Sequence, residues 1–306
     1  MSKVYFTDMR TSFTENLPKK LTRLIDRAGL GTIDFDHKFV AIKIHFGEMG
    51  NLAYLRPQYA RALAAYIKER GGLPFLTDCN TLYVGSRKNA LEHIDTAYQN
   101  GFTPYATGCQ IIIADGLKGN DEVEVPVRGG EYVQKAKIGR AVMDADVFIS
   151  LTHFKGHEEA GFGGALKNVS IGIASSNGKR WIHSAGVTKD KWVETPQDAF
   201  LESMAEADEA VISHMHGKMM YLNVMNRLSV DCDCLASPTE PDMHDIGVLS
   251  SLDPVALDQA CVDLIHTAPD GASVTERIAS LHGEHILEYA EELGIGSRAY
   301  RLTVLD

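Results

Sequence analysis

The sequence lacks any cluster of lysine and arginine. Its 306 residues include 30 Lys and Arg against 41 Asp and Glu, which gives a formal net charge of −11. Nucleic acids and anionic membrane surfaces are bound through basic patches, because their phosphates need positive charge opposite them. We therefore expect neither a nucleic-acid partner nor a membrane partner, and a small molecule as the ligand.

Long apolar runs are missing as well. Apolar runs such as residues 111–114 have the length of a strand, whereas a membrane-spanning helix needs about 18 or more apolar residues. Residues 1–10, MSKVYFTDMR, have neither the apolar stretch nor the small-residue cleavage site of a secretory signal peptide. These two absences lead us to expect a cytoplasmic protein.

Cysteine is too scarce and too irregularly spaced for a disulfide framework. An odd number of cysteines favours free thiols in a reducing compartment. We therefore expect Cys232 and Cys234, which are separated by one residue, to be reduced, because such a pair bridges only with strain. The five cysteines are Cys79, Cys109, Cys232, Cys234 and Cys261.

Strand patterns and helix patterns alternate along the chain. Alternation of this kind predicts an α/β fold with parallel or mixed central sheets and helices on both faces. We expect one domain over residues 1–306, with two lobes at 1–118 and 119–306 as the other option. The predicted strands are 39–46, 73–78, 110–116, 144–153, 218–225, 245–251 and 300–305; the isoleucine run of 110–116 predicts a buried strand. The predicted helices are 56–72, 86–101, 195–217 (with Thr195 as N-cap) and 253–269.

Polar residues follow several of the predicted strands. In open α/β sheets, ligands bind beyond the carboxyl ends of the strands, so these side chains should converge on one rim. They are His45, Glu48, Asp78, Asn80, Asp115, His153, Lys155, His157, Glu158, Asp231 to Cys234, and Asp253.

The segment HFKGHEEAGFGGALKN, residues 153–168, is the richest in chemical groups. Its three glycines Gly161, Gly163 and Gly164 precede Lys167 and the expected start of a helix. Such a loop lets backbone N–H groups approach an anion, with Lys167 and the nearby Lys155 as counter-charges. The other reading is a tight turn with a solvated lysine, and the spacing alone leaves both open.

His153 and His157 of this segment are candidates for acid–base or metal chemistry. On a helix their spacing of four would put both rings on one face, but the intervening Gly156 favours a loop. Metal ligand, substrate contact and structural histidine all stay open. We take His157, Lys167, His153 and Glu158 as candidate catalytic residues. Candidate metal ligands are His153, His157, Cys232 and Cys234.

Three segments resemble the DUF362 family, which is often labelled as uncharacterised iron–sulfur-centre proteins. They are KIHFGEMGNLAYLRP (43–57), LTHFKGHEEAGFGGALKNVSIGIASSNGK (151–179) and VDCDC with DIGVLSSLDPVALDQACVDL (230–264). Many members carry a ferredoxin-like module with four cysteines before the aspartate–cysteine block. Here the corresponding region, 188–211, has no cysteine, so we expect no [4Fe–4S] cluster.

A more distant resemblance is to the nickel-pincer lactate racemase family. That family has an Arg-Pro element after an early strand and, later, a histidine followed by a glycine-rich loop with a lysine. Arg56 in LRPQ, and His157 and Lys167 in GHEEAGFGGALK, follow the same order. The resemblance implies that Arg56, Lys167 and the loop with the three glycines bind a cofactor. Lys155, which is close to this loop in the sequence, is a further candidate for cofactor binding.

Two functions follow from the sequence. The first is a cofactor- or metal-assisted enzyme that acts on a small anionic ligand, its cofactor unidentified, with a divalent transition metal as one option. The second is a non-catalytic binding or redox-partner protein of the iron–sulfur-centre family that has lost its cluster module.

Overall fold

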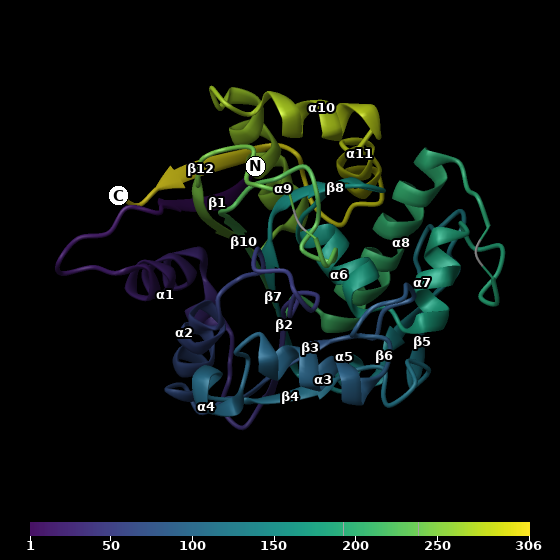
Figure 1. Cartoon of the computed structure of the whole chain (residues 1–306), viewed down its shortest axis with the longest axis horizontal. Helices are drawn as coiled ribbons and strands as arrows, with labels where there is room; N and C mark the ends of the chain where they lie inside the picture. The colour runs from purple at the N-terminus through teal and green to yellow at the C-terminus, as the bar shows by residue number, and fades with distance from the viewer. Residues whose placement is uncertain (192, 238) are drawn as a thin grey trace.

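The fold is built around one large, mostly parallel sheet (Figure 1). The computed structural model describes residues 1–191, 193–237 and 239–306. Within these residues eight strands form this sheet in the order β12-β1-β11-β10-β7-β2-β3-β4, and β11 is the one strand that runs antiparallel to both neighbours. The strands are β1 Ser2–Asp8, β2 Phe39–Lys43, β3 Leu73–Asp78, β4 Gln110–Ile113, β7 Val147–His153, β10 Met219–Met225, β11 Gly247–Ser251 and β12 Tyr300–Val304.

Helices cover both faces of the sheet, and two short hairpins lie beside it. The hairpins are β5 Glu122–Pro126 with β6 Lys135–Gly139, and β8 Lys155–His157 with β9 Gly161–Gly163. The helices are α1 Leu17–Ala28, α2 Pro57–Lys68, α3 Ala90–Gln99, α4 Pro104–Thr107, α5 Arg140–Met143, α6 Ala165–Ile173, α7 Ser176–His183, α8 Gln197–Met215, α9 Pro254–Thr267, α10 Ala272–Ser280 and α11 His285–Glu292, with a 3-10 turn at Leu30–Thr32.

Alternate side chains of each central strand enter two different hydrophobic cores. In β2, Val40 and Ile42 pack with α1 and α2, whereas Ala41 points into the core that contains α6, α8 and α9. In β7, Ile149 packs in the core with α1 and α2, whereas Phe148 packs in the core with α6, α8 and α9. Both faces of a parallel sheet must be buried, so these strands are apolar on each side. The predicted α/β fold with helices on both faces is confirmed.

The strand order reverses between β2 and β7. The chain runs outward from β2 to β3 and β4, then returns to place β7 on the other side of β2 and β10 beyond it. The connections that leave the carboxyl ends of β2 and β7 therefore diverge to opposite sides. A crevice opens at such a point, and it is where this class of fold binds ligands.

Three details differ from the sequence-based expectations. The strand at 110–116 is the edge strand β4 rather than a buried one, and its Ile112 is 43% exposed. The helix at 195–217 has Pro196, not Thr195, as its N-cap. Asp253 follows β11, which runs antiparallel to its neighbours. It therefore lies where the parallel strands begin, whereas the other polar residues lie where those strands end, and it caps α9.

The two halves of the chain contribute strands to the same sheet. Strands β1 to β4 come from residues 1–118, and β7 and β10 to β12 come from residues 119–306. The division into lobes at residue 118 stays a prediction. Across the described parts of the chain, no helix combines the length and apolarity needed to cross a membrane.

Candidate functional site

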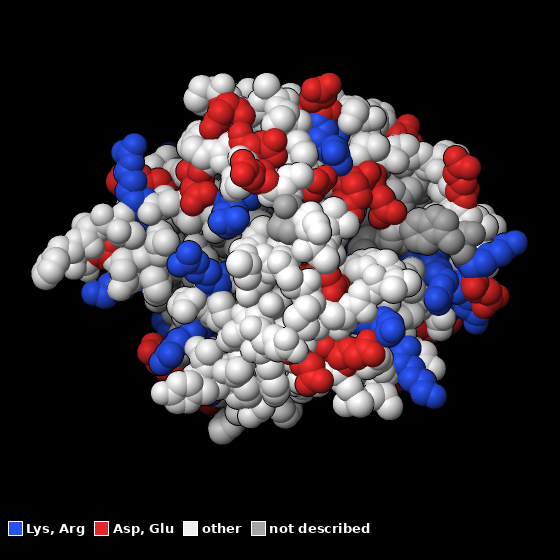
Figure 2. Space-filling model, viewed as in Figure 1, with Lys and Arg blue, Asp and Glu red and all other residues white. Residues whose placement is uncertain are grey.

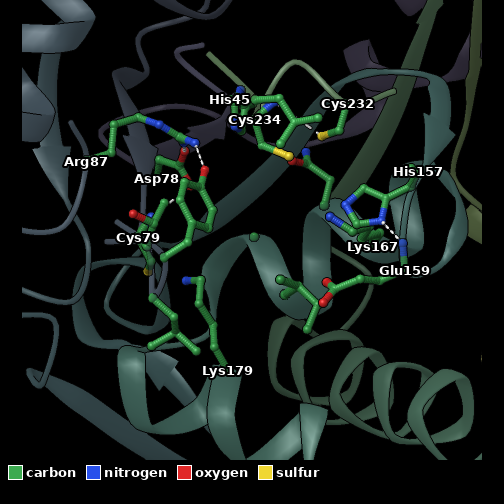
Figure 3. Close-up of a pocket in the computed structure, with 18 of the residues that line it drawn as sticks. His45, Asp78, Cys79, Arg87, His157, Glu159, Lys167, Lys179, Cys232 and Cys234 are labelled. Carbon is green, nitrogen blue, oxygen red and sulfur yellow. Dashed lines mark hydrogen bonds and ion pairs between the residues drawn. The ribbon is translucent and has the colours of Figure 1, made fainter. Parts of the chain in front are cut away.

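A cavity of about 530 Å³ lies at the carboxyl ends of β2, β3 and β7. Its walls come from segments far apart in the sequence. In Figure 3, Arg87 and Asp78 lie on one side, His157 and Lys167 on the other, with Cys232 and Cys234 at one edge and Lys179 at the opposite edge. The segment 153–168 leaves the end of β7, forms the β8–β9 hairpin and enters α6. It therefore supplies one wall of the cavity.

The described side chains of the cavity wall carry an excess of positive charge. Five cations line it, against three carboxylates, in a chain whose net charge is −11. Glu48 and Asp233 behind the wall pair with Arg87 and Lys155, so the attraction of an anionic ligand has to come from the lysines that form no such pair. The cations are Lys43, Arg87, Lys155, Lys167 and Lys179, and the carboxylates are Asp78, Glu158 and Glu159.

Asp78 neutralises two of these cations on the β2–β3 side. Its carboxylate lies 3.1 Å from Lys43 Nζ and 3.4 Å from Arg87 Nη1, while Arg87 Nε lies 3.3 Å from Glu48. Burial alone would raise the pKa of Asp78, but Lys43 and the neighbouring His93 hold it well below its usual range. Burial lowers the pKa of Lys43. These charges stay paired as part of the wall.

Asp233 is the centre of a second buried ionic cluster. Its carboxylate lies 2.8 Å from Lys155 Nζ, 3.2 Å from His153 Nδ1 and 3.6 Å from His45 Nδ1. Burial opposes ionisation of Asp233, yet Lys155 holds its pKa well below its usual range. The cluster ties the loop that carries Cys232 and Cys234 to β7 and β2.

His153 belongs to this cluster and is not among the residues that line the cavity. Its Nδ1 faces Asp233, and its Nε2 lies 2.7 Å from the Asn226 carbonyl oxygen. Both ring nitrogens therefore already have partners. His153, predicted as a catalytic and metal-binding residue, therefore has a structural position: through Asp233 it holds the loop that carries Cys232 and Cys234.

Lys167 and Lys179 form no close ion pair with a carboxylate among the described residues, although the charge of Lys167 lowers the pKa of Glu159 and the charge of Lys179 opposes the rise in the pKa of Asp115. Lys179 Nζ donates to the Ala174 carbonyl oxygen at 2.5 Å. Lys167, on the first turn of α6, is half-buried and makes no hydrogen bond or ion pair within the described parts of the chain. Their charges are therefore available to a ligand in the cavity.

The ring of His157 is held in one tautomer. Its Nδ1 accepts hydrogen bonds from the backbone N–H groups of Glu159 at 3.0 Å and Ala160 at 3.2 Å. A nitrogen that accepts carries no proton, so in the neutral ring the proton is on Nε2. Burial, Lys167 and Lys155 hold the pKa of His157 well below its usual range. His157 thus presents a neutral Nε2–H group, which lies 3.8 Å from Glu158 and has no hydrogen-bond partner among the described residues.

His45 repeats this arrangement after β2. Its Nδ1 accepts from the Gly47 N–H at 3.1 Å, and its Nε2 is buried without a partner in the described structure. Gly47 has φ of +79°, and a Cβ there would lie 2.4 Å from the Tyr54 ring, so this turn requires glycine. Burial and Arg87 hold the pKa of His45 well below its usual range. Two neutral imidazole N–H donors therefore belong to the cavity wall.

Cys232 and Cys234 lie beside His157 and Glu158. One nitrogen, oxygen or sulfur atom from each of these four residues lies within 4.8 Å of all the others. Burial opposes ionisation of Cys232, but a hydrogen bond from the Cys234 thiol and the charge of Lys155 hold the pKa of Cys232 below that of an ordinary thiol. Three of the four predicted metal ligands, His157, Cys232 and Cys234, thus come together. The fourth member of the group is Glu158 rather than the predicted His153.

The glycine loop differs from the predicted anion cradle. The Asp258 carboxylate accepts from the N–H groups of Ala165 at 2.8 Å and Leu166 at 2.9 Å, so an internal anion already occupies the start of α6. Gly164 lets Asp258 approach, since a Cβ there would lie 2.5 Å from the carboxylate. Gly163 and Gly164 line the cavity, whereas Gly161 packs against Gly283 outside it.

Arg56 lies apart from the loop with which the sequence grouped it. It is exposed, precedes α2 as its N-cap residue and does not line the cavity. The structure therefore does not bring Arg56 together with His157 and Lys167.

Comparison with known proteins identifies the family. Residues 40–263 match the family described as "Domain of unknown function (DUF362)". The chain belongs to the DUF362 family. A thylakoid-associated protein of Synechocystis sp. is 26% identical over 232 residues, which cover 72% of this chain and 60% of that protein. The DUF362 chain thus spans about 60% of the length of this relative.

Two solved structures are similar at lower identity. The lactate racemase apoprotein from Thermoanaerobacterium thermosaccharolyticum is 15% identical with a TM-score of 0.45, over 72% of this chain and 50% of that one. A protein from Thermotoga maritima is 14% identical with a TM-score of 0.49, over 90% of this chain and 58% of that one. Both similarities concern the arrangement of helices and strands.

Two of the five cysteines of this DUF362 chain come together at the candidate metal-binding group. All five are free thiols, and of these only Cys232 and Cys234 belong to a candidate metal-binding group among the described residues. Cys109 and Cys261 lie in different hydrophobic cores. A [4Fe–4S] cluster needs four cysteine ligands around one point, and the absence of such a cluster stays a prediction.

Several residues of the cavity wall were missed from the sequence. Arg87 and Lys43 were not candidates, and His45 was included by position alone. A lysine within the apolar run FVAIKIHF was a usable signal, because a charge inside a buried strand needs a partner. Arg87 gave no such signal, since its polar surroundings in the sequence resemble an ordinary loop.

Proposed function

We propose that the cavity binds a small anionic ligand and that the chain is an enzyme acting on it. The observation that carries the proposal is the combination of two cations without a close ion pair among the described residues, Lys167 and Lys179, with two neutral imidazole N–H donors, His45 and His157, around one cavity. Cations supply affinity for the anion, and N–H donors orient its oxygens.

The two histidines suit a catalytic role better than a role in charge pairing. A neutral imidazole that donates from Nε2 can stabilise negative charge developing on a substrate oxygen, without itself bringing a positive charge. Lys167 would stabilise the same charge from the start of α6, and in metal-free protein Glu158, 3.8 Å from His157, is a carboxylate that could exchange a proton with the substrate. The proposed reaction class is acid–base chemistry at an oxygen-bearing anionic substrate.

Calorimetric titration with inorganic phosphate and with succinate tests the binding. Metal-free protein should bind at least one of these probes, and Lys167→Met or Lys179→Met should weaken that binding by about tenfold or more, since each removes a charge-assisted contact. Lys118→Met, at an exposed lysine outside the cavity wall, is the matched control and should leave the affinity unchanged. Equal affinities in all three variants and the parent would refute the proposal.

Turnover separates an enzyme from a binding protein. The parent and His157→Phe would each be incubated with a panel of small organic acids and phosphate esters and the mixtures analysed by mass spectrometry. Product formation that disappears in His157→Phe supports the enzyme. Binding without product in any mixture would instead favour the non-catalytic binding protein.

A further inference from the structure

We propose that Cys232, Cys234 and Glu158 bind one thiophilic divalent cation such as Zn²⁺, in a three-ligand site that opens onto the cavity. His157 is not a ligand of this ion but donates a hydrogen bond to whatever occupies the open coordination position. The binding of the ion does not depend on the proposed anionic ligand.

The donor atoms already lie close together. Cys234 Sγ is 3.6 Å from Glu158 Oε1, and the metal-binding group as a whole spans at most 4.8 Å between donor atoms. A tetrahedral zinc site with ligands at about 2.0–2.3 Å from the ion places its donor atoms about 3.3–3.8 Å apart, so the distance between Cys234 and Glu158 already fits and wider ones have to close by up to about 1 Å. Small side-chain rotations would therefore suffice to place one ion between the three residues.

The surroundings of Cys232 suit a metal-bound thiolate. Its sulfur is buried and accepts a hydrogen bond from the Cys234 backbone N–H at 3.3 Å. Asp233 Oδ1 lies 3.5 Å from the same sulfur, but Lys155 Nζ neutralises that carboxylate at 2.8 Å. Such outer contacts orient metal ligands and keep their charge stable.

The hydrogen bonds of His157 exclude it from the ligand set. A histidine that binds a metal through Nε2 normally donates its Nδ1–H to an acceptor. Here two backbone N–H groups point at Nδ1, so a proton on that atom would face two donors. The same contacts leave the proton on Nε2, where it can serve a metal-bound oxygen instead.

Two thiolates and one carboxylate select the kind of ion. Sulfur donors favour zinc over magnesium or calcium, and the two cysteines that come together are too few for an iron–sulfur cluster. Three protein ligands with an open fourth position are the pattern of catalytic rather than structural zinc sites. The cavity beside the site, with Lys167 in its wall, would bring an anionic ligand to that position.

Titration of tag-free, metal-free protein with Zn²⁺ in phosphate-free buffer tests the site, with Co²⁺ as the spectroscopic probe. The parent should bind one equivalent and show a thiolate-to-cobalt charge-transfer absorption. Cys232→Ser, Cys234→Ser and Glu158→Gln should each weaken binding by more than about a hundredfold. His157→Gln should keep the affinity, and so should Cys109→Ser, whose thiol lies in a core away from the cavity.

Two results would overturn the site. One is unchanged metal binding in the double variant Cys232→Ser/Cys234→Ser, and the other is loss of binding in His157→Gln while that variant stays folded. If the cysteine variants fail to fold, alkylation of the parent decides: stoichiometric Zn²⁺ should protect Cys232 and Cys234 from iodoacetamide. Equal labelling with and without Zn²⁺ would contradict the proposal, whatever the outcome of the phosphate titrations.

Discussion

The direction of single hydrogen bonds decides what the cavity can do. His157 and His45 each accept a backbone N–H from a residue two positions further along the chain, and this local contact fixes the side on which each ring keeps its proton. Lys43 and Lys155 form close ion pairs with Asp78 and Asp233, whereas Lys167 and Lys179 form none among the described residues. Function at this scale depends on which polar atoms are left without partners.

Gly164 offers a test of how the glycine loop is used. Gly164→Ala should destabilise the protein by about 1–3 kcal/mol, because the new Cβ would meet the Asp258 carboxylate at 2.5 Å. Gly163→Ala is the matched control, since its Cβ would meet Lys155 at an ordinary 3.6 Å. Urea unfolding of both variants measures the difference. Equal stabilities would mean that Asp258 moves aside freely.

The sequence identified the segment 153–168 as part of the site, but not which of its residues face the cavity and which have internal partners. The residue types and the preceding apolar run were sufficient to place His157, Gly163 and Lys167 at the end of a buried strand. The anion at the start of α6 comes from Asp258, which is 93 residues from Ala165 in the chain. Such a long-range partner leaves no local pattern, so an internal carboxylate and an external ligand look alike in the sequence.

At the scale of elements, buried side chains join α8 to the β5–β6 hairpin. Glu206 on α8 accepts from the backbone N–H groups of Tyr132 at 3.1 Å and Val133, and from the Tyr289 hydroxyl at 2.9 Å. The hairpin turn thereby gains acceptors that its own backbone does not supply. This contact stabilises the side of the molecule that carries α7 and Lys179.

Replacement of Glu206 measures that contact. Glu206→Gln should lower the free energy of unfolding by about 2–3 kcal/mol, because an amide NH₂ group would face backbone donors in place of a carboxylate oxygen. Glu202 on the same helix bonds the side chains of His285, at 2.8 Å, and Tyr132, and an amide oxygen can still accept from them. Glu202→Gln should therefore cost less than about 1 kcal/mol. Equal losses in the two variants would contradict this account.

The elements themselves could be predicted, but their spatial order could not. Alternation of apolar strands and capped helices gave β2, β3, β7 and α9 close to their observed bounds. The antiparallel direction of β11 depends on pairing with β1 and β10, which are distant in the chain. That direction places Asp253 away from the cavity, which explains why the expected convergence of polar residues failed there.

The whole molecule is acidic around a locally positive cavity. In Figure 2, acidic side chains gather over the upper part of the visible face, where α10 lies in Figure 1, and the centre of that face is nearly free of charged side chains. An acidic surface repels anions at long range, so affinity for an anionic ligand has to come from the cavity wall itself.

Asp208 makes the stability of the whole fold depend on pH. Both of its carboxylate oxygens are buried without a partner in the described structure, and burial with the charge of Asp258 raises its pKa well above 3.8. Above pH 3.8 the unfolded chain loses this proton while the folded chain keeps it, so stability falls as pH rises towards the folded pKa. Asp208→Asn should remove this slope.

Urea unfolding at about pH 5 and about pH 8 tests this prediction. The parent should lose more stability than Asp208→Asn between the two conditions, by up to about 1.4 kcal/mol for each pH unit that the carboxyl stays protonated. Ionisable groups distant from Asp208 cancel in the comparison, whereas Asp258 is coupled to Asp208, so the measured difference includes any change in its titration. Parallel losses in the two proteins would show that Asp208 has an ordinary pKa.

The most direct test of the account is the tautomer of His157 in metal-free protein. Heteronuclear NMR of the ¹⁵N-labelled imidazole, assigned by comparison with His157→Gln, reports which ring nitrogen carries the proton. We predict a neutral ring at about pH 7 with the proton on Nε2 and none on Nδ1, because two backbone N–H groups donate to Nδ1. A proton on Nδ1 would contradict the account, because Nε2 would then be a lone pair suited to a metal rather than a donor to an anion.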